Sequence, residues 1–142
     1  MPAGYWSERV NSVNPARFYK LTERNLPETL RKLQAIIPLS IFSNIDLSNV
    51  LPAFGIDVNL FTHILSSSSL KNPKPALDGF YKIIELSKLP ANEILYAGDD
   101  EKKDVFPAKT VGLQTGILWK ISEKADYSFQ GFAEIVKLVE SQ

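Results

Sequence analysis

The residues in this sequence that are best suited to chemistry form a short acidic segment from Gly98 to Asp104. Asp99 and Asp104 lie five positions apart, across a predicted loop that enters a helix. Hard cations such as Mg²⁺ prefer carboxylate oxygens and keep several waters, so this pair could supply part of a metal site. Taken alone, the segment is more typical of a solvated acidic loop that caps a helix, because aspartate is common in caps and turns.

Two other positions could bind an anion. Ser43 and Asn44 follow an apolar segment, and the Ser43 hydroxyl could donate a hydrogen bond to an anionic oxygen. Lys74, which precedes Pro75, could offer a point positive charge to a phosphoryl group. Each has an ordinary alternative, since serine is common in turns and most lysines lie on the surface.

The segments around these residues alternate between the two hydrophobic patterns. We expect strands at 39–42, 61–65, 93–97 and within 111–118, and helices at 26–37, 47–54, 76–89, 104–110 and 132–139. Strands that alternate with helices predict a three-layer α/β/α, Rossmann-like domain with a parallel sheet. Ligands bind at the carboxyl ends of the strands in such sheets, so Ser43, Lys74 and the acidic segment are expected at one rim.

Composition restricts the function classes. The chain of 142 residues fits one domain, and its 16 basic and 16 acidic residues argue against a broad nucleic-acid footprint. The absence of cysteine excludes disulfides, thiolate zinc sites and cysteine nucleophiles. No apolar run approaches the ~20 residues of a membrane helix, and the first residues lack a signal pattern. We therefore expect a cytoplasmic protein without nucleic-acid or membrane partners.

The order of the polar groups resembles the second, third and fourth motifs of the haloacid dehalogenase (HAD) superfamily of hydrolases. These motifs read here as strand-Ser-Asn, then Lys-Pro before a helix, then strand-Gly-Asp-Asp-x-x-x-Asp. Phe80, six residues after Lys74, and the stretch 105–118 also look like the family. The resemblance covers roughly residues 26–140 and implies a HAD-like fold with the chemistry of a Mg²⁺-dependent phosphatase.

The resemblance also implies roles for these residues. Ser43, Asn44 and Lys74 would bind the phosphoryl group of a phosphorylated small molecule, with Ser43 and Lys74 acting in catalysis.

The acidic segment would form the metal site. Asp99 and Asp104 would hold Mg²⁺ directly or through water, and Asp100 would support their loop as part of that site. This acidic pair looks like the phosphatase type of the motif, because dehalogenases of the family usually lack it.

The first motif of the family, Asp-x-Asp-x-Thr, is missing before Ser43, and the first aspartate of the sequence is Asp46. In the family, the first aspartate of that motif is the nucleophile and the second is the general acid and base. Its absence implies that Mg²⁺ binds weakly or not at all, and that this chain alone has no covalent route to phosphoryl transfer.

The same absence affects the sheet. In the family, the first strand lies between the strands that end here at Ser43 and Asp99. Without it, we expect the sheet to close by direct pairing, to borrow a strand from residues 1–20, or to pair with another molecule through its exposed edges, self-association included. Residues 1–25 look like the remnant of a helical cap or an N-terminal extension, and 26–142 like an incomplete core domain.

Three functional hypotheses follow. The chain could be an incomplete hydrolase, inactive by itself because of truncation or a late start. It could instead be a non-catalytic module with a HAD-like fold that binds a partner or a phosphorylated ligand. In the third hypothesis, an active enzyme receives its nucleophile from another chain.

Overall fold

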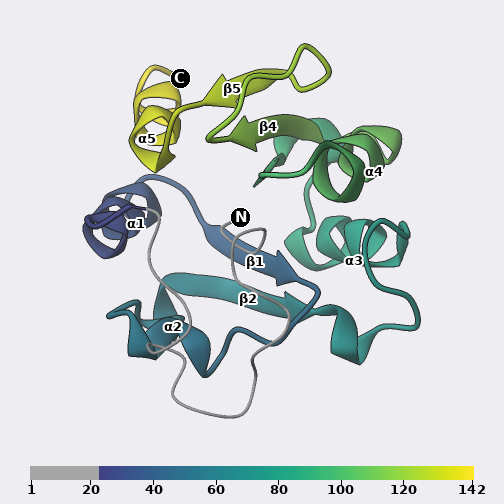
Figure 1. Ribbon diagram of the computed structural model, residues 1–142, viewed down its shortest axis with the longest axis horizontal. Coiled ribbons are helices and arrows are strands. Elements are labelled where there is room, and N and C mark those ends of the chain that lie inside the picture. The colour runs from purple at the N-terminus through teal and green to yellow at the C-terminus, as the bar shows by residue number, and fades with distance from the viewer. Residues whose placement is uncertain (1–22) are drawn as a thin grey trace.

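The protein alternates short strands with helices along the chain (Figure 1). The structure is a computed structural model that describes residues 23–142. The strands are Leu39–Ser43 (β1), Phe61–Ser66 (β2), Leu95–Gly98 (β3), Gln114–Leu118 (β4) and Tyr127–Phe129 (β5). The helices are Leu26–Gln34 (α1), Val50–Ala53 (α2), Asp78–Ser87 (α3), Phe106–Thr110 (α4) and Phe132–Glu140 (α5).

All strand pairs in the described part of the chain are parallel, but they belong to two sheets. β1 pairs with β2, whereas β3, β4 and β5 form a second sheet in that order. The predicted parallel α/β architecture is therefore confirmed. Direct pairing between the strands that end at Ser43 and Gly98, one of the three expected ways to close the sheet, does not occur among residues 23–142.

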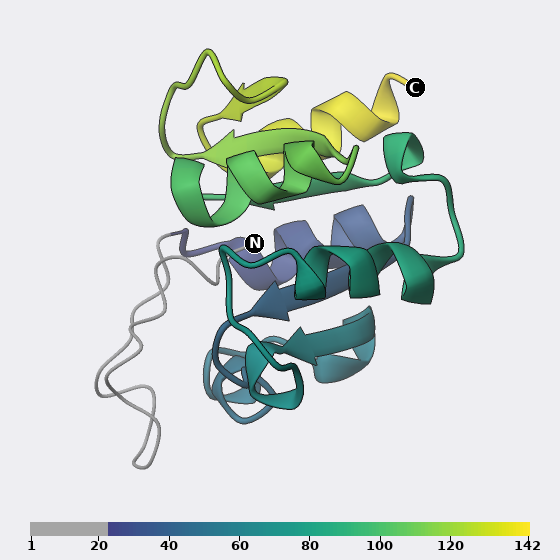
Figure 2. The same cartoon turned by 90° about the vertical axis from the view of Figure 1, so that its right-hand side faces the viewer.

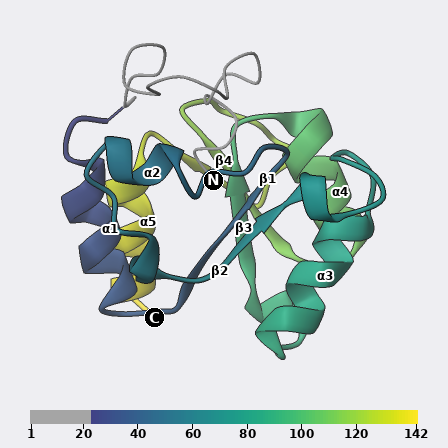
Figure 3. The same ribbon diagram turned by 90° about the horizontal axis from the view of Figure 1, so that it is seen from below.

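Helices cover both faces of the strands. Figure 3 shows α1 and α5 on one side and α3 and α4 on the other. Successive strand residues point to opposite faces, so Ile41 packs in a core with residues of α1 and α5, while Phe42 packs with Phe80 of α3. Both cores also contain residues of the second sheet, Ala97 in the first and Tyr96 in the second. The helices and these side chains therefore hold the two sheets together.

The local sequence of helix α1 accounts for where the helix begins and which side chains it buries. Pro27 lies in its first turn and Glu28 complements the helix dipole, while Leu30 and Leu33 are buried. The helix ends at Gln34, short of the predicted Ile37. The Asn25 side chain does not cap the helix, and the Asn25 backbone carbonyl accepts hydrogen bonds from the backbone N–H and the hydroxyl of Thr29.

Glu23, the first described residue, is hydrogen-bonded to residues in the C-terminal part of the chain. Its carboxylate accepts hydrogen bonds from the backbone N–H of Phe132 at 3.2 Å and from the indole of Trp119 at 3.0 Å. The carboxylate lies at the N-terminus of α5, where the helix dipole favours negative charge. The predicted remnant of a helical cap at 1–25 otherwise lies outside the described residues.

Two elements differ from their prediction. β5 was not expected, because three residues are too short to show a periodic pattern. The predicted helix 104–110 begins earlier, with a π-helical turn at Glu101–Val105 that continues into α4. None of the helices in residues 23–142 is long and apolar enough to cross a membrane.

Candidate active site at the carboxyl ends of the strands

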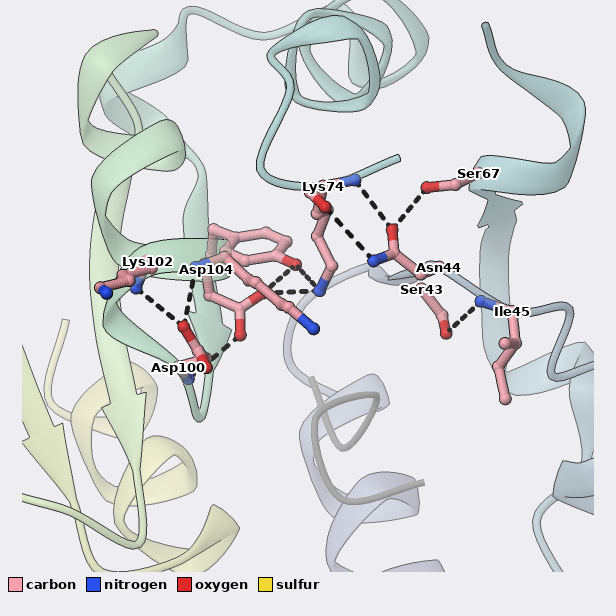
Figure 4. Close-up of polar contacts among 10 residues, drawn as sticks. Ser43, Asn44, Ile45, Ser67, Lys74, Asp100, Lys102 and Asp104 are labelled. Atoms are coloured by element: carbon pink, nitrogen blue, oxygen red, sulfur yellow. Dashed lines mark hydrogen bonds and ion pairs between the residues drawn. The ribbon is translucent and has the colours of Figure 1, made fainter. Parts of the chain in front are cut away.

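The predicted site residues lie where β1 and β3 end. Parallel strands place their carboxyl ends at one rim, and Ser43 is the last residue of β1 while Gly98 is the last of β3. In Figure 4, Lys74 reaches from the loop before α3 into the space between the Ser43–Asn44 turn and the loop that carries Asp100 and Asp104. The tertiary structure thus gathers side chains from three separate segments.

A buried ion pair forms the centre of this site. The Lys74 ammonium lies 2.6 Å from Asp104 Oδ1, and their side chains are only 5% and 2% exposed. The hydroxyl of Tyr96 donates to the same carboxylate oxygen at 3.0 Å and accepts from Lys74 Nζ at 3.3 Å. Burial of such charges is tolerated because they are paired and hydrogen-bonded.

Gly98 makes this packing possible. A Cβ atom on Gly98 would lie 2.4 Å from Cγ of Asp104, far inside van der Waals contact. The absence of a side chain at the end of β3 therefore lets the Asp104 carboxylate lie against the strand. The other Asp104 oxygen accepts from the backbone N–H of Asp100 at 3.2 Å.

The surroundings shift the ionisation of this group in definite directions. Burial by itself would raise the pKa of Asp104, but the Lys74 ammonium and the Tyr96 hydroxyl hold that pKa below its ordinary value. Burial, and then the Asp104 carboxylate, raise the pKa of the Tyr96 phenol well above its ordinary value. Asp104 and Tyr96 therefore remain a carboxylate and a neutral phenol at neutral pH.

Asn44 ties the end of β1 to the lysine loop. Its side-chain oxygen accepts from the backbone N–H of Lys74 at 2.9 Å and from the hydroxyl of Ser67 at 2.7 Å. Its amide nitrogen lies 3.5 Å from the Lys74 carbonyl oxygen. In this arrangement Asn44 positions the lysine backbone, and the direct phosphate contact expected of Asn44 stays a prediction.

Ser43 is buried at the same rim. Its hydroxyl oxygen accepts from the backbone N–H of Ile45 at 3.1 Å. Among residues 23–142, no acceptor takes the hydroxyl proton, so this proton can be donated to an anionic oxygen. The phosphate-binding and catalytic roles of Ser43 and Lys74 fit this geometry and stay predictions.

The acidic loop contains carboxylates in different environments. Asp100 Oδ1 accepts from the backbone N–H groups of Lys102 and Lys103, both at 2.8 Å, so this residue supports the loop. Asp99 Oδ1 is buried and has no hydrogen-bond partner among the described residues. Burial, and then the Asp104 carboxylate, raise the pKa of Asp99, although Lys120 opposes the shift.

An unpartnered buried carboxylate oxygen is a suitable ligand for a cation. Mg²⁺ is commonly held by one or two carboxylates together with waters and substrate phosphates. Asp99 and Asp104 could supply these carboxylates. Within residues 23–142 there is no group of three side chains that could hold a metal. Asp99 Oδ1 is open to a cation, whereas both oxygens of Asp104 already accept hydrogen bonds. Mg²⁺ binding by Asp99, Asp100 and Asp104 stays a prediction.

A shallow cavity of about 370 Å³ opens beside this loop. Its walls come from the acidic loop and from the end of β4 and the residues after it: Asp100, Glu101, Lys102, Ile117, Lys120 and Ile121. The rim thus offers space and lysine side chains next to the acidic pair.

Sequence reasoning missed Tyr96 as a site residue, because a tyrosine inside an apolar strand is usually a packing residue. It does pack, with its ring centroid 5.0 Å from that of Phe80. Its position two residues before Gly98 was the only available signal, because that position points to the same sheet face as Gly98.

Comparison with protein families gives a match over most of the chain. The family model described as "Haloacid dehalogenase-like hydrolase" matches residues 8–118. Among the curated proteins, none matches this chain.

Several solved structures share the fold. One is a predicted phosphoglycolate phosphatase from Haemophilus somnus, which has 29% sequence identity to this chain and a TM-score of 0.68. The match covers 83% of this chain and 56% of the phosphatase chain. A 2-haloacid dehalogenase from Pseudomonas syringae has 18% sequence identity and a TM-score of 0.71, and the match covers 86% of this chain and 54% of the dehalogenase chain. An uncharacterized protein from Listeria monocytogenes has 20% sequence identity and a TM-score of 0.71, and the match covers 90% of this chain and 87% of the Listeria chain. The chain thus spans about half the length of the first two.

Proposed function

Because the chain belongs to the haloacid dehalogenase-like hydrolases, we propose that it supplies the phosphate-binding and magnesium-binding part of a phosphohydrolase site. We propose further that it does not turn over phosphate esters alone. The observation that carries this proposal is the buried arrangement of Lys74, Asp104 and Tyr96 at the rim where β1 and β3 end. The likeness to a predicted phosphoglycolate phosphatase supports a phosphate ester as ligand.

In this site, each residue of the chain has a physical task. The Ser43 hydroxyl donates to a phosphoryl oxygen, and the Lys74 ammonium offsets negative charge on the phosphoryl group. Asp104 keeps Lys74 in place and, with Asp99, would hold Mg²⁺. When bound, Mg²⁺ neutralises phosphoryl oxygens as a Lewis acid.

None of these residues supplies the nucleophile that a phosphohydrolase needs. Before Ser43 the sequence has no aspartate, and the first one, Asp46, accepts a hydrogen bond from the backbone N–H of Ser48 in an exposed turn. Serine, asparagine and lysine at the rim can stabilise charge. Among residues 23–142, the rim aspartates are assigned to Mg²⁺ and to the support of their loop, so none of them is left as the nucleophile of the proposed site. We therefore infer that the chain binds phosphate without hydrolysing its esters.

The experiment uses the full chain with p-nitrophenyl phosphate and Mg²⁺, and inorganic phosphate binding is measured by calorimetry under the same conditions. We expect no turnover, and phosphate binding that is at least tenfold weaker in Lys74→Met than in Lys82→Met, which removes an exposed lysine. Robust turnover that Asp99→Ala abolishes would refute the inactivity. Equal phosphate affinity in the two lysine variants would refute the site.

A second candidate is a non-catalytic module that binds a phosphorylated ligand and keeps the fold, and the same lack of an aspartate before Asp46 favours it. The two candidates differ in their response to a supplied nucleophile. A partial active site gains turnover when an aspartate reaches the rim, whereas a pure binding module does not.

A further inference from the structure

Tyr96 carries a buried hydroxyl group that its packing does not require. The residue is 6% exposed, and its ring centroid lies 5.0 Å from that of Phe80 and 6.5 Å from that of Phe42. In Figure 2, helix α3, which carries Phe80, lies in front of the strands, between the β1–β2 sheet and the sheet of β3, β4 and β5. A phenylalanine would fill the same space as the tyrosine, and a buried hydroxyl is costly unless it is hydrogen-bonded. The hydroxyl therefore needs an explanation other than packing.

The direction of each hydrogen bond around this hydroxyl follows from the chemistry of its partners. An ammonium has three N–H donors and no acceptor, whereas a carboxylate can only accept. Lys74 Nζ therefore donates to the Tyr96 hydroxyl at 3.3 Å, and the single hydroxyl proton goes to Asp104 Oδ1 at 3.0 Å. Lys74 also donates to Asp104 Oδ1 at 2.6 Å, so each of these three side chains contacts the other two.

This closed arrangement holds the Lys74 ammonium at two points. A single acceptor would let the lysine side chain pivot about one contact, whereas two acceptors on different elements fix Nζ and set the direction of its third N–H. Tyr96 belongs to β3 and Asp104 to the π-helical turn that follows. The ring of Phe42 lies 5.5 Å from Nζ and limits the movement of the lysine further. Among residues 23–142, the acceptors of the ammonium are Asp104 and Tyr96, so its third N–H can be donated to a ligand.

We propose that Tyr96 is a positioning residue of the phosphate site, whose hydroxyl holds the Lys74 ammonium so that its third N–H meets a phosphoryl oxygen. Tyr96 acts through Lys74 and does not itself contact the ligand. The proposal rests on the proposed function, because it takes Lys74 as a residue that binds phosphate. A donor that is already held in place loses less side-chain freedom when a ligand arrives, so the hydroxyl increases the affinity for phosphate.

The test removes the hydroxyl and keeps the ring. Binding of inorganic phosphate in the presence of Mg²⁺ is measured by calorimetry for the full-length Tyr96→Phe chain. The matched control is Tyr81→Phe, which removes the hydroxyl of a tyrosine that is 57% exposed. We expect phosphate binding to be about threefold to tenfold weaker in Tyr96→Phe, because the ammonium must then be ordered when phosphate binds, and unchanged in Tyr81→Phe.

A double-mutant cycle separates positioning from a general structural effect. Because Tyr96 acts through Lys74, we expect Tyr96→Phe to cause no further loss of phosphate affinity in a chain that already carries Lys74→Met. A hydroxyl that only stabilises the fold, or that binds phosphate directly, would weaken binding equally in both backgrounds.

A second measurement follows the lysine without any ligand, so it also covers a Lys74→Met chain that does not fold. In isotope-labelled protein, NMR relaxation of the Lys74 ammonium reports its motion on the picosecond-to-nanosecond timescale. We expect this ammonium to be more mobile in Tyr96→Phe than in the wild type or in Tyr81→Phe.

Three outcomes would overturn the role of Tyr96. They are unchanged phosphate affinity in Tyr96→Phe, an equal loss of affinity with and without Lys74, and equal mobility of the Lys74 ammonium in Tyr96→Phe and the wild type. If Lys74→Met and Lys82→Met bind phosphate equally, the proposed function fails and the role of Tyr96 fails with it. Weaker binding in Lys74→Met but not in Tyr96→Phe leaves the proposed function in place and removes only the role of Tyr96.

Discussion

At the scale of single residues, Lys74 and Asp104 are each other's main electrostatic partner inside the protein. We predict that Lys74→Met lowers the free energy of unfolding by about 3 kcal/mol, because it leaves a buried carboxylate without its cation. Combining it with Asp104→Leu should restore much of this loss. Urea denaturation measures both variants.

The matched control is Lys82→Met, which breaks an exposed ion pair with Glu85 at 3.3 Å. Exposed pairs contribute little, so we expect a change below about 0.5 kcal/mol. Equal destabilisation by the two methionine variants would show that Lys74 is not paired in the way the structure indicates.

Asp99 and Asp104 should affect the pH dependence of stability with opposite signs. The pKa of Asp99 is raised above 3.8, so stability is lost as the pH rises through its folded pKa, and Asp99→Asn should stabilise the protein at neutral pH. The pKa of Asp104 is lowered, so its contribution is present above 3.8 and lost as the pH falls through the folded value. Asp104→Asn should therefore destabilise the protein at neutral pH.

Urea denaturation of both asparagine variants from about pH 3 to pH 7 checks these signs. The stabilisation by Asp99→Asn should fade as the pH falls through the folded pKa and below 3.8, because the wild-type carboxyl is then protonated in both states. A neutral-pH loss of stability in Asp99→Asn would contradict the conclusion that burial and the Asp104 carboxylate destabilise the ionised Asp99 side chain.

At the scale of elements, the contact between α3 and β1 depends on a glycine. A Cβ atom on Gly79 would lie 2.0 Å from Cζ of Phe42, whose ring is 5.3 Å from that of Phe80 and buried. We predict that Gly79→Ala lowers the free energy of unfolding by about 1–3 kcal/mol, because overpacking outweighs the gain of about 1 kcal/mol in helix propensity.

Thermal denaturation compares this variant with Tyr81→Ala in the same helix. Tyr81 is 57% exposed, so its replacement should change the free energy of unfolding by less than about 0.5 kcal/mol. A Gly79→Ala protein that is more stable than the wild type would show that α3 can move away from β1 at no cost.

At the scale of the whole molecule, the two sheets are not paired with each other among residues 23–142, so alternate amides of β3 point away from β4. We predict that the amide protons of Leu95 and Ala97 exchange with solvent faster than that of Tyr96, which bonds to β4. Hydrogen exchange followed by NMR resolves these neighbours individually. Equal protection of Ala97 and Tyr96 would mean that the outer edge of β3 is also hydrogen-bonded.

Much of the architecture could be predicted from local patterns. Hydrophobic periodicity predicts the strands that end at Ser43 and Gly98, as well as helices α1, α3 and α5. The spacing of apolar residues shows which face of an element is buried. The gathering of Ser43 and Lys74 at one rim followed from the parallel topology. β5 could not be predicted, because three residues carry no period.

The sequence by itself determined the residue types at the rim, the lack of an aspartate before Asp46, and the alternation of strands and helices. Only the tertiary structure decided that Tyr96 completes the Lys74–Asp104 pair and that Asn44 holds the lysine loop. It also decided that, among residues 23–142, β1 and β3 belong to two separate sheets. The physical reason is that periodicity is a local property of the chain. Strand pairing and side-chain contacts depend instead on which distant segments come together.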